Sequence, residues 1–194
     1  DVRRERQPMP TVFKRGRREL KLSNLAKPFW PEEGITKGDL LAYYRDVADV
    51  LVPHLRGRPF TMKRYPDGWN GKHFFQKDTP KHAPAWLKTS RFPATQRSGE
   101  TRDIDYALID DELALLWVVN MGCIDMNAWY SKVDRPDRPD FVLFDLDPSP
   151  DVGFPAVVHA ALLAKDVLDS LGLQGYPKTI GSAGMHVLVL VQRR

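Results

Sequence analysis

The sequence predicts an α+β domain in which helices cover a sheet, and four stretches carry that prediction. Residues 36–55 place apolar side chains at helical spacing behind Thr36, a residue type suited to cap a helix. Residues 141–147, FVLFDLD, form a short apolar run typical of a buried strand. Residues 154–172 repeat the helical spacing, and residues 185–191, MHVLVLV, form a second strong strand. Strand, helix and strand in succession indicate a sheet covered by helices.

Further elements extend this prediction through the N-terminal half. Residues 58–66, RPFTMKRYP, predict a strand that ends at the turn PDGWNG, and residues 72–78 predict a second short strand, so a hairpin is expected. Residues 107–122 are mostly apolar and predict a buried helix. Near the other end of the chain, Gly172 is placed to terminate the helix before it. We expect one domain over residues 19–194.

The composition excludes several classes of protein. The 194 residues are 42% hydrophobic and 28% charged, as in soluble globular proteins. No stretch approaches the roughly 20 apolar residues that span a bilayer, and the basic N-terminus has no apolar core behind it, so we expect neither a membrane protein nor a signal peptide. The single cysteine, Cys123, excludes an internal disulfide framework and a cysteine-based zinc cluster. It fits a reducing cytoplasm.

Positive charge is concentrated at the N-terminus. Residues 1–21 contain eight basic and three acidic residues, whereas the rest of the chain is close to neutral. We expect residues 1–18 to form a basic, flexible arm. Such an arm favours a polyanionic partner, although a solvated tail without a partner fits the same composition.

Two acids close the strand FVLFDLD. Asp145 and Asp147 alternate along it, so they share one face with Cα atoms about 6.5–7 Å apart, opposite Phe144 and Leu146. Two neighbouring carboxylates repel each other unless a cation or a proton lies between them, and oxygen ligands suit Mg²⁺ and Mn²⁺. A bare D-x-D pattern is common, however, and an exposed strand end with two solvated acids fits it as well.

Residues 175–184, GYPKTIGSAG, predict a glycine-containing loop that leads into the last strand. Gly181 and Gly184 flank Ser182, so backbone N–H groups are free to approach a phosphate, and the serine adds a hydroxyl. His186 stands where the loop enters the strand and is a plausible donor beside a triphosphate. The alternative is a tight turn followed by a core histidine.

Phe74 and Phe75 stand in tandem among lysines and histidines, in the stretch GKHFFQKDTPKH. Aromatic side chains beside basic ones are typical of a base-stacking platform with phosphate-binding neighbours. The alternative is a pair of core phenylalanines. Because adjacent strand residues face opposite ways, we expect at least one of the two to lie in the core.

In this order, three stretches closely resemble the polymerase domain of bacterial ligase D, which is part of the archaeo-eukaryotic primase-polymerase superfamily. They are residues 57–87, residues 141–150 and residues 179–191, and residues 22–59 resemble the family as well. The resemblance covers roughly residues 19–191. It implies a primase-polymerase type fold with mixed or antiparallel sheets flanked by helices and an RRM-like catalytic module. It also implies DNA-dependent nucleotidyl transfer with two metal ions.

The resemblance implies four groups of site residues. These are the catalytic, metal-binding Asp145 and Asp147; the nucleotide-binding Ser182, His186 and Lys63; the DNA 5′-phosphate-binding Asn24, Lys27 and Lys37; and the template or base-stacking Phe74, Phe75 and Arg64. The implied cofactors are Mn²⁺ or Mg²⁺, and the implied substrates are ribo- or deoxyribonucleoside triphosphates. The implied partners are DNA with 5′-phosphorylated gaps or ends, with Ku and ligase components. This activity belongs to double-strand break repair by non-homologous end joining, in the nucleoid of a prokaryotic cytoplasm.

The sequence departs from the family pattern at several positions. Where members commonly have T-S-G-S-K-G-L-H, this chain has Ile180 in place of a serine and Ala183 in place of a lysine. Asn127 stands where many members have a histidine after an acidic residue, here Asp125. These departures bear on nucleotide affinity and preference. The family's third metal-binding aspartate lies on a later strand, so the catalytic module is expected to be incomplete in a sequence ending at Arg194.

Two other functions compete with a polymerase. A non-catalytic module could hold a 5′-phosphorylated DNA end with Lys27, Lys37, Phe74 and the basic arm, without a complete metal site. Metal-dependent phosphodiester hydrolysis would share the D-x-D chemistry, but the sequence has no further acid or histidine cluster to support it.

Overall fold

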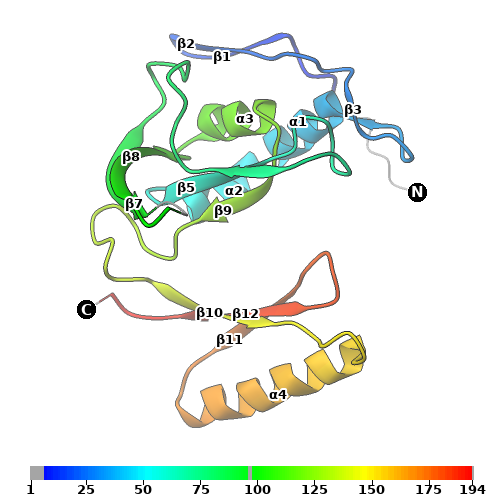
Figure 1. The fold of residues 1–194 in the computed structure, drawn as a ribbon, viewed down its shortest axis with the longest axis vertical. Helices are drawn as coiled ribbons and strands as arrows, with labels where there is room; N and C mark the ends of the chain where they lie inside the picture. Colours follow the sequence, from blue (N-terminus) through cyan, green and yellow to red (C-terminus); the bar gives the residue numbers. More distant parts are fainter. Residues whose placement is uncertain (1–6, 96–97, 194) are drawn as a thin grey trace. The chain divides into compact units, whose positions relative to one another are not determined.

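The computed structural model describes residues 7–95 and 98–193 (Figure 1). The chain divides into two compact units, Asp1–Trp129 and Tyr130–Arg194, which we call the N-terminal and C-terminal units. Both units combine antiparallel β-sheet with α-helix. The predicted α+β class is therefore confirmed.

The N-terminal unit is built on a five-stranded antiparallel sheet. Its strands are β5 (Pro59–Arg64), β6 (Phe74–Gln76), β7 (Thr89–Thr95), β8 (Thr101–Leu108) and β9 (Cys123–Ala128). β5 is central: β9 pairs along one edge, while β6 and β8 share the other edge, and β7 follows β8. The pairing of β5 with β6 confirms the predicted hairpin.

Three helices pack with this sheet. They are α1 (Lys37–Asp46), α2 (Ala48–Leu55) and α3 (Glu112–Asn120). α3 is buried from Leu113 to Val119, because its sequence is apolar on every side, and it starts behind the capping side chain of Asp111. The single helix predicted for residues 36–55 is two helices, since Val47 ends α1 and α2 begins at Ala48.

Thr36 caps α1 as predicted. Its hydroxyl accepts a hydrogen bond from the Asp39 backbone N–H (3.2 Å), and the Asp39 carboxylate accepts one from the Thr36 N–H (2.8 Å). This reciprocal pair is a capping box, which satisfies two backbone donors that the helix start would otherwise leave without partners. It fixes the position of Lys37, the first residue of the helix.

The expected flexible arm over residues 1–18 needs correction within the described residues; residues 1–6 lie outside them. β1 (Val12–Arg15) and β2 (Arg18–Lys21) form an antiparallel hairpin, followed by the short pair β3 (Pro28–Trp30) and β4 (Ile35–Thr36). The opposed pair Phe13 and Leu20 is buried in the core. The alternation of apolar and charged residues in these strands outweighs the overall charge that suggested a loose arm.

The C-terminal unit has one three-stranded antiparallel sheet and one helix (Figure 1). Its elements are β10 (Phe141–Leu146), α4 (Phe154–Ser170), β11 (Gly175–Thr179) and β12 (Met185–Leu190), and β12 is the central strand. Leu168 of α4 packs against Val187 and Val189 of β12. Gly172, with a φ of 68°, follows the end of α4 as predicted.

Two predictions for this unit are wrong. β10 was expected to be buried, but Val142 and Phe144 are each 41% exposed, because β10 is an edge strand and the helix covers mainly the central strand. The stretch GYPKT, expected as a loop, is β11. Its Pro177 cannot donate to a ladder, but an edge strand tolerates a proline.

No helix among the described residues is both long enough and apolar enough to cross a membrane.

Candidate functional site

The segment between β2 and β3 forms a tight turn that positions Lys27. Asn24 adopts a left-handed backbone conformation (φ 55°), which asparagine tolerates better than most residues, and its carbonyl accepts a hydrogen bond from the Lys27 N–H at 2.9 Å. The Lys27 ammonium donates to the Pro66 carbonyl (2.6 Å) and to the Asp67 carboxylate (2.8 Å). The ammonium therefore has a fixed direction.

Lys37 is buried, with only 5% of its surface exposed. Its backbone N–H donates to the Lys27 carbonyl (2.8 Å), and its ammonium donates to the Ser23 carbonyl (2.7 Å). Burial, and to a smaller extent the positive charges of Lys27 and Arg64, together lower its pKa to about 8. The buried ammonium is thus held where a negatively charged partner would stabilise it.

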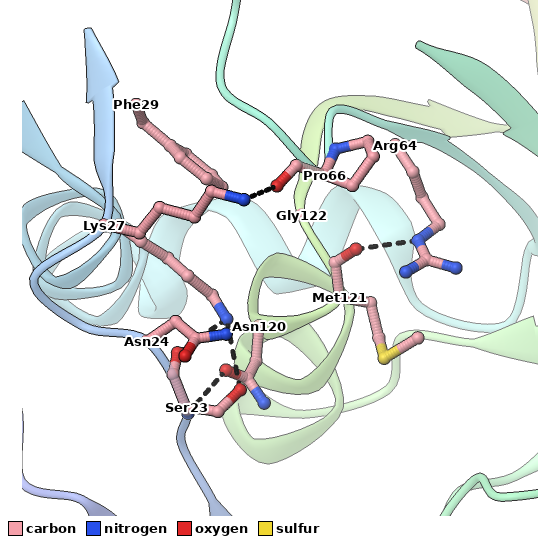
Figure 2. Close-up of a pocket in the computed structure, with 10 residues that line it drawn as sticks. Ser23, Asn24, Lys27, Phe29, Arg64, Pro66, Asn120, Met121 and Gly122 are labelled. Atoms are coloured by element: carbon pink, nitrogen blue, oxygen red, sulfur yellow. Dashed lines mark hydrogen bonds between the residues drawn. The ribbon is translucent and has the colours of Figure 1, made fainter. Parts of the chain in front are cut away.

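These side chains line one pocket of about 240 Å³ (Figure 2). Its walls are Ser23, Asn24, Lys27, Phe29, Lys37, Arg64, Pro66, Asn120, Met121 and Gly122. Figure 2 shows the Lys27 ammonium directed at Pro66, and the Arg64 guanidinium donating to the Met121 carbonyl (2.7 Å). Three cations and no acid are among the lining residues, and the positive end of the α1 dipole lies at Lys37. The pocket therefore suits an anion such as a phosphate group.

Sequence reasoning missed the far wall of this pocket. Asn120, the last residue of α3, accepts a hydrogen bond from the Ser23 N–H (3.1 Å) and donates to the Lys21 carbonyl (3.1 Å). These contacts hold the segment after β2 against the end of α3. The only local signal was one polar residue at the end of an otherwise apolar helix, which is also what an ordinary helix end contains.

A second cluster forms around Lys63 on the same sheet. Lys63 of β5 lies between Phe75 of β6 and Asp125 of β9, because the strand register pairs it with both. Its ammonium is 2.8 Å from the Asp125 carboxylate and 5.8 Å from the centre of the Phe75 ring. The hydrogen bond with Asp125 raises the pKa of Lys63. The Phe75 ring, the Lys63 ammonium and the Asp125 carboxylate therefore lie in a row across three strands.

The two tandem phenylalanines are both exposed, Phe74 by 45% and Phe75 by 60%. The prediction that at least one of them lies in the core is wrong. β6 is a three-residue edge strand, so neither of its faces is covered there. The Arg64 guanidinium lies 5.2 Å from the Phe74 ring centre, within reach of a cation–π contact.

In the C-terminal unit, Asp145 and His186 form a cross-strand pair of β10 and β12. The His186 Nε2 atom lies 3.3 Å from the Asp145 carboxylate. By strand alternation they occupy the face opposite Val187 and Val189, which pack against the helix. Ser182 is exposed in the loop between β11 and β12. This sheet face thus presents a carboxylate and an imidazole side by side.

Asp147 lies one residue beyond the end of β10, beside the loop that contains Ser182. Across residues 7–95 and 98–193, no three or more His, Cys, Asp or Glu side chains are grouped to hold a metal ion. Two carboxylates still fit Mg²⁺ or Mn²⁺, because such ions are often held by one or two carboxylates, with waters and substrate phosphates completing the coordination. Asp145 and Asp147 would be those ligands.

The predicted site residues therefore fall into two groups, one in each unit. In the N-terminal unit, Asn24, Lys27, Lys37 and Arg64 line one pocket, and the second cluster adds Lys63, Phe74 and Phe75. In the C-terminal unit, Asp145, Asp147, Ser182 and His186 lie at one end of the sheet and its loop.

The basic pocket of the N-terminal unit, and the strand-end acids beside a glycine loop in the C-terminal unit, have the chemistry that phosphate-bearing ligands require. Residues 36–194 match the family model described as "LigD, primase-polymerase domain", so the chain belongs to this family. The resemblance noted in the sequence is confirmed.

Relatives in three bacteria support this assignment. The chain is 34% identical over 174 residues to the "Multifunctional non-homologous end joining DNA repair protein LigD" of Mycobacterium tuberculosis. It is 33% identical over 175 residues to the LigD protein of Pseudomonas aeruginosa, and 30% identical over 171 residues to that of Bacillus subtilis. The matches cover 86%, 90% and 88% of this chain but only 22%, 20% and 26% of those proteins.

A solved structure confirms the fold. The "Polymerase Domain from Mycobacterium tuberculosis Ligase D in complex with DNA" matches with a TM-score of 0.78 and 32% sequence identity. The match covers 89% of this chain and 61% of that chain. The expected primase-polymerase type fold is therefore confirmed.

Proposed function

We propose that this chain is the nucleotidyltransferase part of a DNA end-joining system, acting on DNA gaps or ends that carry a 5′-phosphate. The observation that carries the proposal is the pocket around Lys27, Lys37 and Arg64, in a family with a solved polymerase domain in complex with DNA. The pocket has the charge and size for a terminal phosphate group. A base-reading surface would need no such buried cations.

The 5′-phosphate would be bound by Lys27 and Lys37. Both ammonium groups are point charges held by backbone carbonyls, so binding a phosphate costs little further ordering. Lys37 is largely protonated at neutral pH, because its pKa of about 8 lies above that value. Asn24 contributes the turn that holds Lys27 in place.

The transfer itself would take place at Asp145 and Asp147. In this step the primer 3′-hydroxyl would lose its proton to solvent water while its oxygen forms a bond to the α-phosphorus of a nucleoside triphosphate. The bond from the α-phosphorus to the bridging oxygen of the β-phosphate would break, and pyrophosphate would leave. When Mg²⁺ or Mn²⁺ is bound by the two carboxylates, it supplies charge neutralisation on the transferring phosphoryl group. Ser182 and His186 would hold the triphosphate as hydrogen-bond donors.

The exposed rings of Phe74 and Phe75 would receive the template base and the incoming nucleotide. Stacking on an aromatic ring contributes about 1–3 kcal/mol per base and does not depend on sequence. Lys63 and Arg64, which lie beside those rings, would contact nearby phosphates. This arrangement suits an enzyme that fills short gaps of any sequence.

The biological setting we propose is double-strand break repair by non-homologous end joining, with Ku and ligase components as partners, in the cytoplasm at the nucleoid. The support is the name shared by the relatives, of which this chain spans about a fifth to a quarter.

Binding to gapped duplexes with a 5′-phosphate or a 5′-hydroxyl tests the pocket. We expect the phosphate to strengthen binding by about tenfold, as a desolvated charge pair would, and K27A and K37A to remove that difference. Lys88→Ala is the control, since Lys88 is an exposed lysine of the same unit paired with Asp110. Equal affinity of the unchanged chain for both duplexes would refute the roles of Lys27 and Lys37.

Primer extension tests the catalytic part. With Mn²⁺ and all nucleotides, the chain should add nucleotides to the gap, and D145N and D147N should abolish addition while keeping the preference for a 5′-phosphate. Absence of incorporation under these conditions would refute the polymerase.

A non-catalytic module that binds DNA ends is the second candidate. It is favoured by the fact that the phosphate pocket lies within one unit, while the described residues contain no three-ligand metal cluster. Phosphate-dependent binding without any incorporation of nucleotides would establish this function instead.

A further inference from the structure

The two glycines of the loop before β12 have different surroundings. Gly184 is buried and lies just beyond the last paired residues of the ladder, Leu146 and Met185. A Cβ atom on Gly184 would lie 2.5 Å from an Asp147 carboxylate oxygen, 2.8 Å from the Leu146 carbonyl oxygen and 2.9 Å from the Ile180 side chain. Real Cβ atoms essentially never come within 3.0 Å of such neighbours.

Gly181, three residues earlier in the same loop, is exposed and would meet nothing within 4 Å. Neither glycine has the positive φ that favours glycine over other residues. The requirement at position 184 is therefore for space and not for backbone freedom. The sequence pattern alone gave the two glycines the same role.

The missing side chain allows the loop backbone to pack directly against Asp147. The loop closes on itself, because the Ile180 N–H donates to the Gly184 carbonyl at 3.3 Å. It also carries Ser182. The carboxylate that we assign to metal binding and the hydroxyl that we assign to the triphosphate thus lie on two segments that pack directly against each other.

We propose that Gly184 is a positioning residue, which sets the place of the Asp147 carboxylate and couples it to the Ser182 loop. The expected effect on metal binding rests on the proposed function. The close packing around Gly184 does not depend on that function. Of the neighbours that a methyl group would meet, the Leu146 carbonyl belongs to the paired strand end and cannot move without disturbing the ladder. The Asp147 side chain can rotate, so it gives way.

A displacement of about half an ångström is enough to impair a metal site, because ligands must be held within about 0.5 Å of the productive geometry. Adding a methyl group at position 184 should therefore weaken divalent metal binding. Adding one at position 181 should leave it unchanged.

The first test measures Mn²⁺ binding to the chain by electron paramagnetic resonance, without nucleotide turnover. We expect Gly184→Ala to weaken binding by about tenfold or more, approaching Asp147→Asn, and Gly181→Ala to stay within about twofold of the unchanged chain. A folded Gly184→Ala chain with unchanged Mn²⁺ affinity would overturn the proposal.

The second test uses thermal unfolding and needs no metal. Gly184→Ala should lower Tm, and in a chain that already carries Asp147→Ala the same change should lower Tm by no more than half as much, because one clash is gone. Equal losses in the two backgrounds would overturn the coupling to Asp147. This result also separates the two proposals: a chain that shows the coupling but binds no Mn²⁺ refutes the catalytic assignment alone.

Discussion

At the scale of single residues, Lys37 determines the electrostatics of the pocket that we propose for a 5′-phosphate. It is a buried lysine beside two other cations, and it is held by a backbone carbonyl instead of a carboxylate. Burial and like charge both disfavour its protonated form. A bound phosphate would reverse that cost, so binding and protonation of Lys37 are linked.

This linkage predicts that affinity for a 5′-phosphorylated DNA end falls as the pH rises through about 8, the pKa of Lys37. Between about pH 7 and pH 9 the protonated fraction drops from about nine-tenths to about one-tenth, so the dissociation constant should rise several-fold. Fluorescence anisotropy over this range measures it. Lys37→Arg, which stays charged, should flatten the dependence, and a chain whose affinity is constant across it would contradict the assignment.

The pH dependence of the stability of the ligand-free chain should have the opposite sign to that of the affinity for DNA. The folded pKa of Lys37, about 8, lies below its ordinary value of 10.5, so the unfolded state binds more protons between these two pH values. The contribution of Lys37 to the free energy of unfolding therefore rises with pH in that window. Denaturant titrations at several pH values, compared with the same titrations of Lys37→Met, isolate this contribution.

At the scale of elements, the start of α1 links local sequence to the pocket. Thr36 and Asp39 form the capping box, and Lys37 follows directly as the first helical residue. The position of Lys37 in the pocket therefore depends on a local capping signal, which the sequence predicted at Thr36. The sequence did not predict that Asn120, at the end of α3, forms the opposite wall of the pocket.

We expect Thr36→Ala to lower the free energy of unfolding by about 1 kcal/mol, because it removes the capping hydrogen bond to Asp39. It should also reduce the preference for a 5′-phosphate, since the capping box no longer fixes the position of Lys37, the first residue of α1. Urea unfolding and duplex binding measure the two effects. Thr11→Ala, at an exposed threonine outside the helices, should change neither; a cap variant as stable as this control would show that the box contributes little.

Several elements show why local patterns were not sufficient. The sequence predicted one helix over residues 36–55 and a loop over GYPKT, but Val47 separates two helices and the loop is β11. The hairpin Val12–Lys21 was not predicted, because its basic composition suggested a flexible arm. It is tied to the start of α3 by Arg18 and Asp111, whose side chains lie 2.6 Å apart. Contacts outside the local pattern, namely the ladder of β11 with β12 and the ion pair of Arg18 with Asp111, decided two of these cases.

At the scale of the whole molecule, the two units differ in how much apolar surface they bury. The N-terminal unit has a continuous core that includes nearly all of α3. In the described part of the C-terminal unit, the core cluster is Leu168, Val187 and Val189, with Leu146 and Ala161 packed against it. The exposed apolar residues on α4 and directly after it include Leu162, Leu163, Val167 and Leu171.

The same substitution should therefore have very different costs in the two units. Leu115→Ala, at a fully buried position of α3, should destabilise its unit by about 2–5 kcal/mol. Leu162→Ala, at a position 54% exposed on α4, should stay within about 0.5 kcal/mol of the unchanged chain. Chemical denaturation measures both, and a large cost at Leu162 would show that α4 is covered in solution.

Hydrogen exchange of the 194-residue chain should show the same difference between the units. Backbone amides of β10 and β11 should exchange faster than those of α3, because opening the smaller core exposes less apolar surface. Mass spectrometry of the peptides that cover these elements measures the rates. Equal protection in β10 and α3 would indicate one cooperative unit.

The sequence by itself determined the features that depend on neighbours along the chain: the cap at Thr36, the hairpin of β5 and β6, the helix that ends before Gly172, and the motifs that identify the family. Only the tertiary structure decided which residues line the pocket and how little space surrounds Gly184. Ser23 and Asn120 lie 97 positions apart, and the space around Gly184 depends on where β10 ends. Such contacts arise from packing between distant segments, and no local periodicity encodes them.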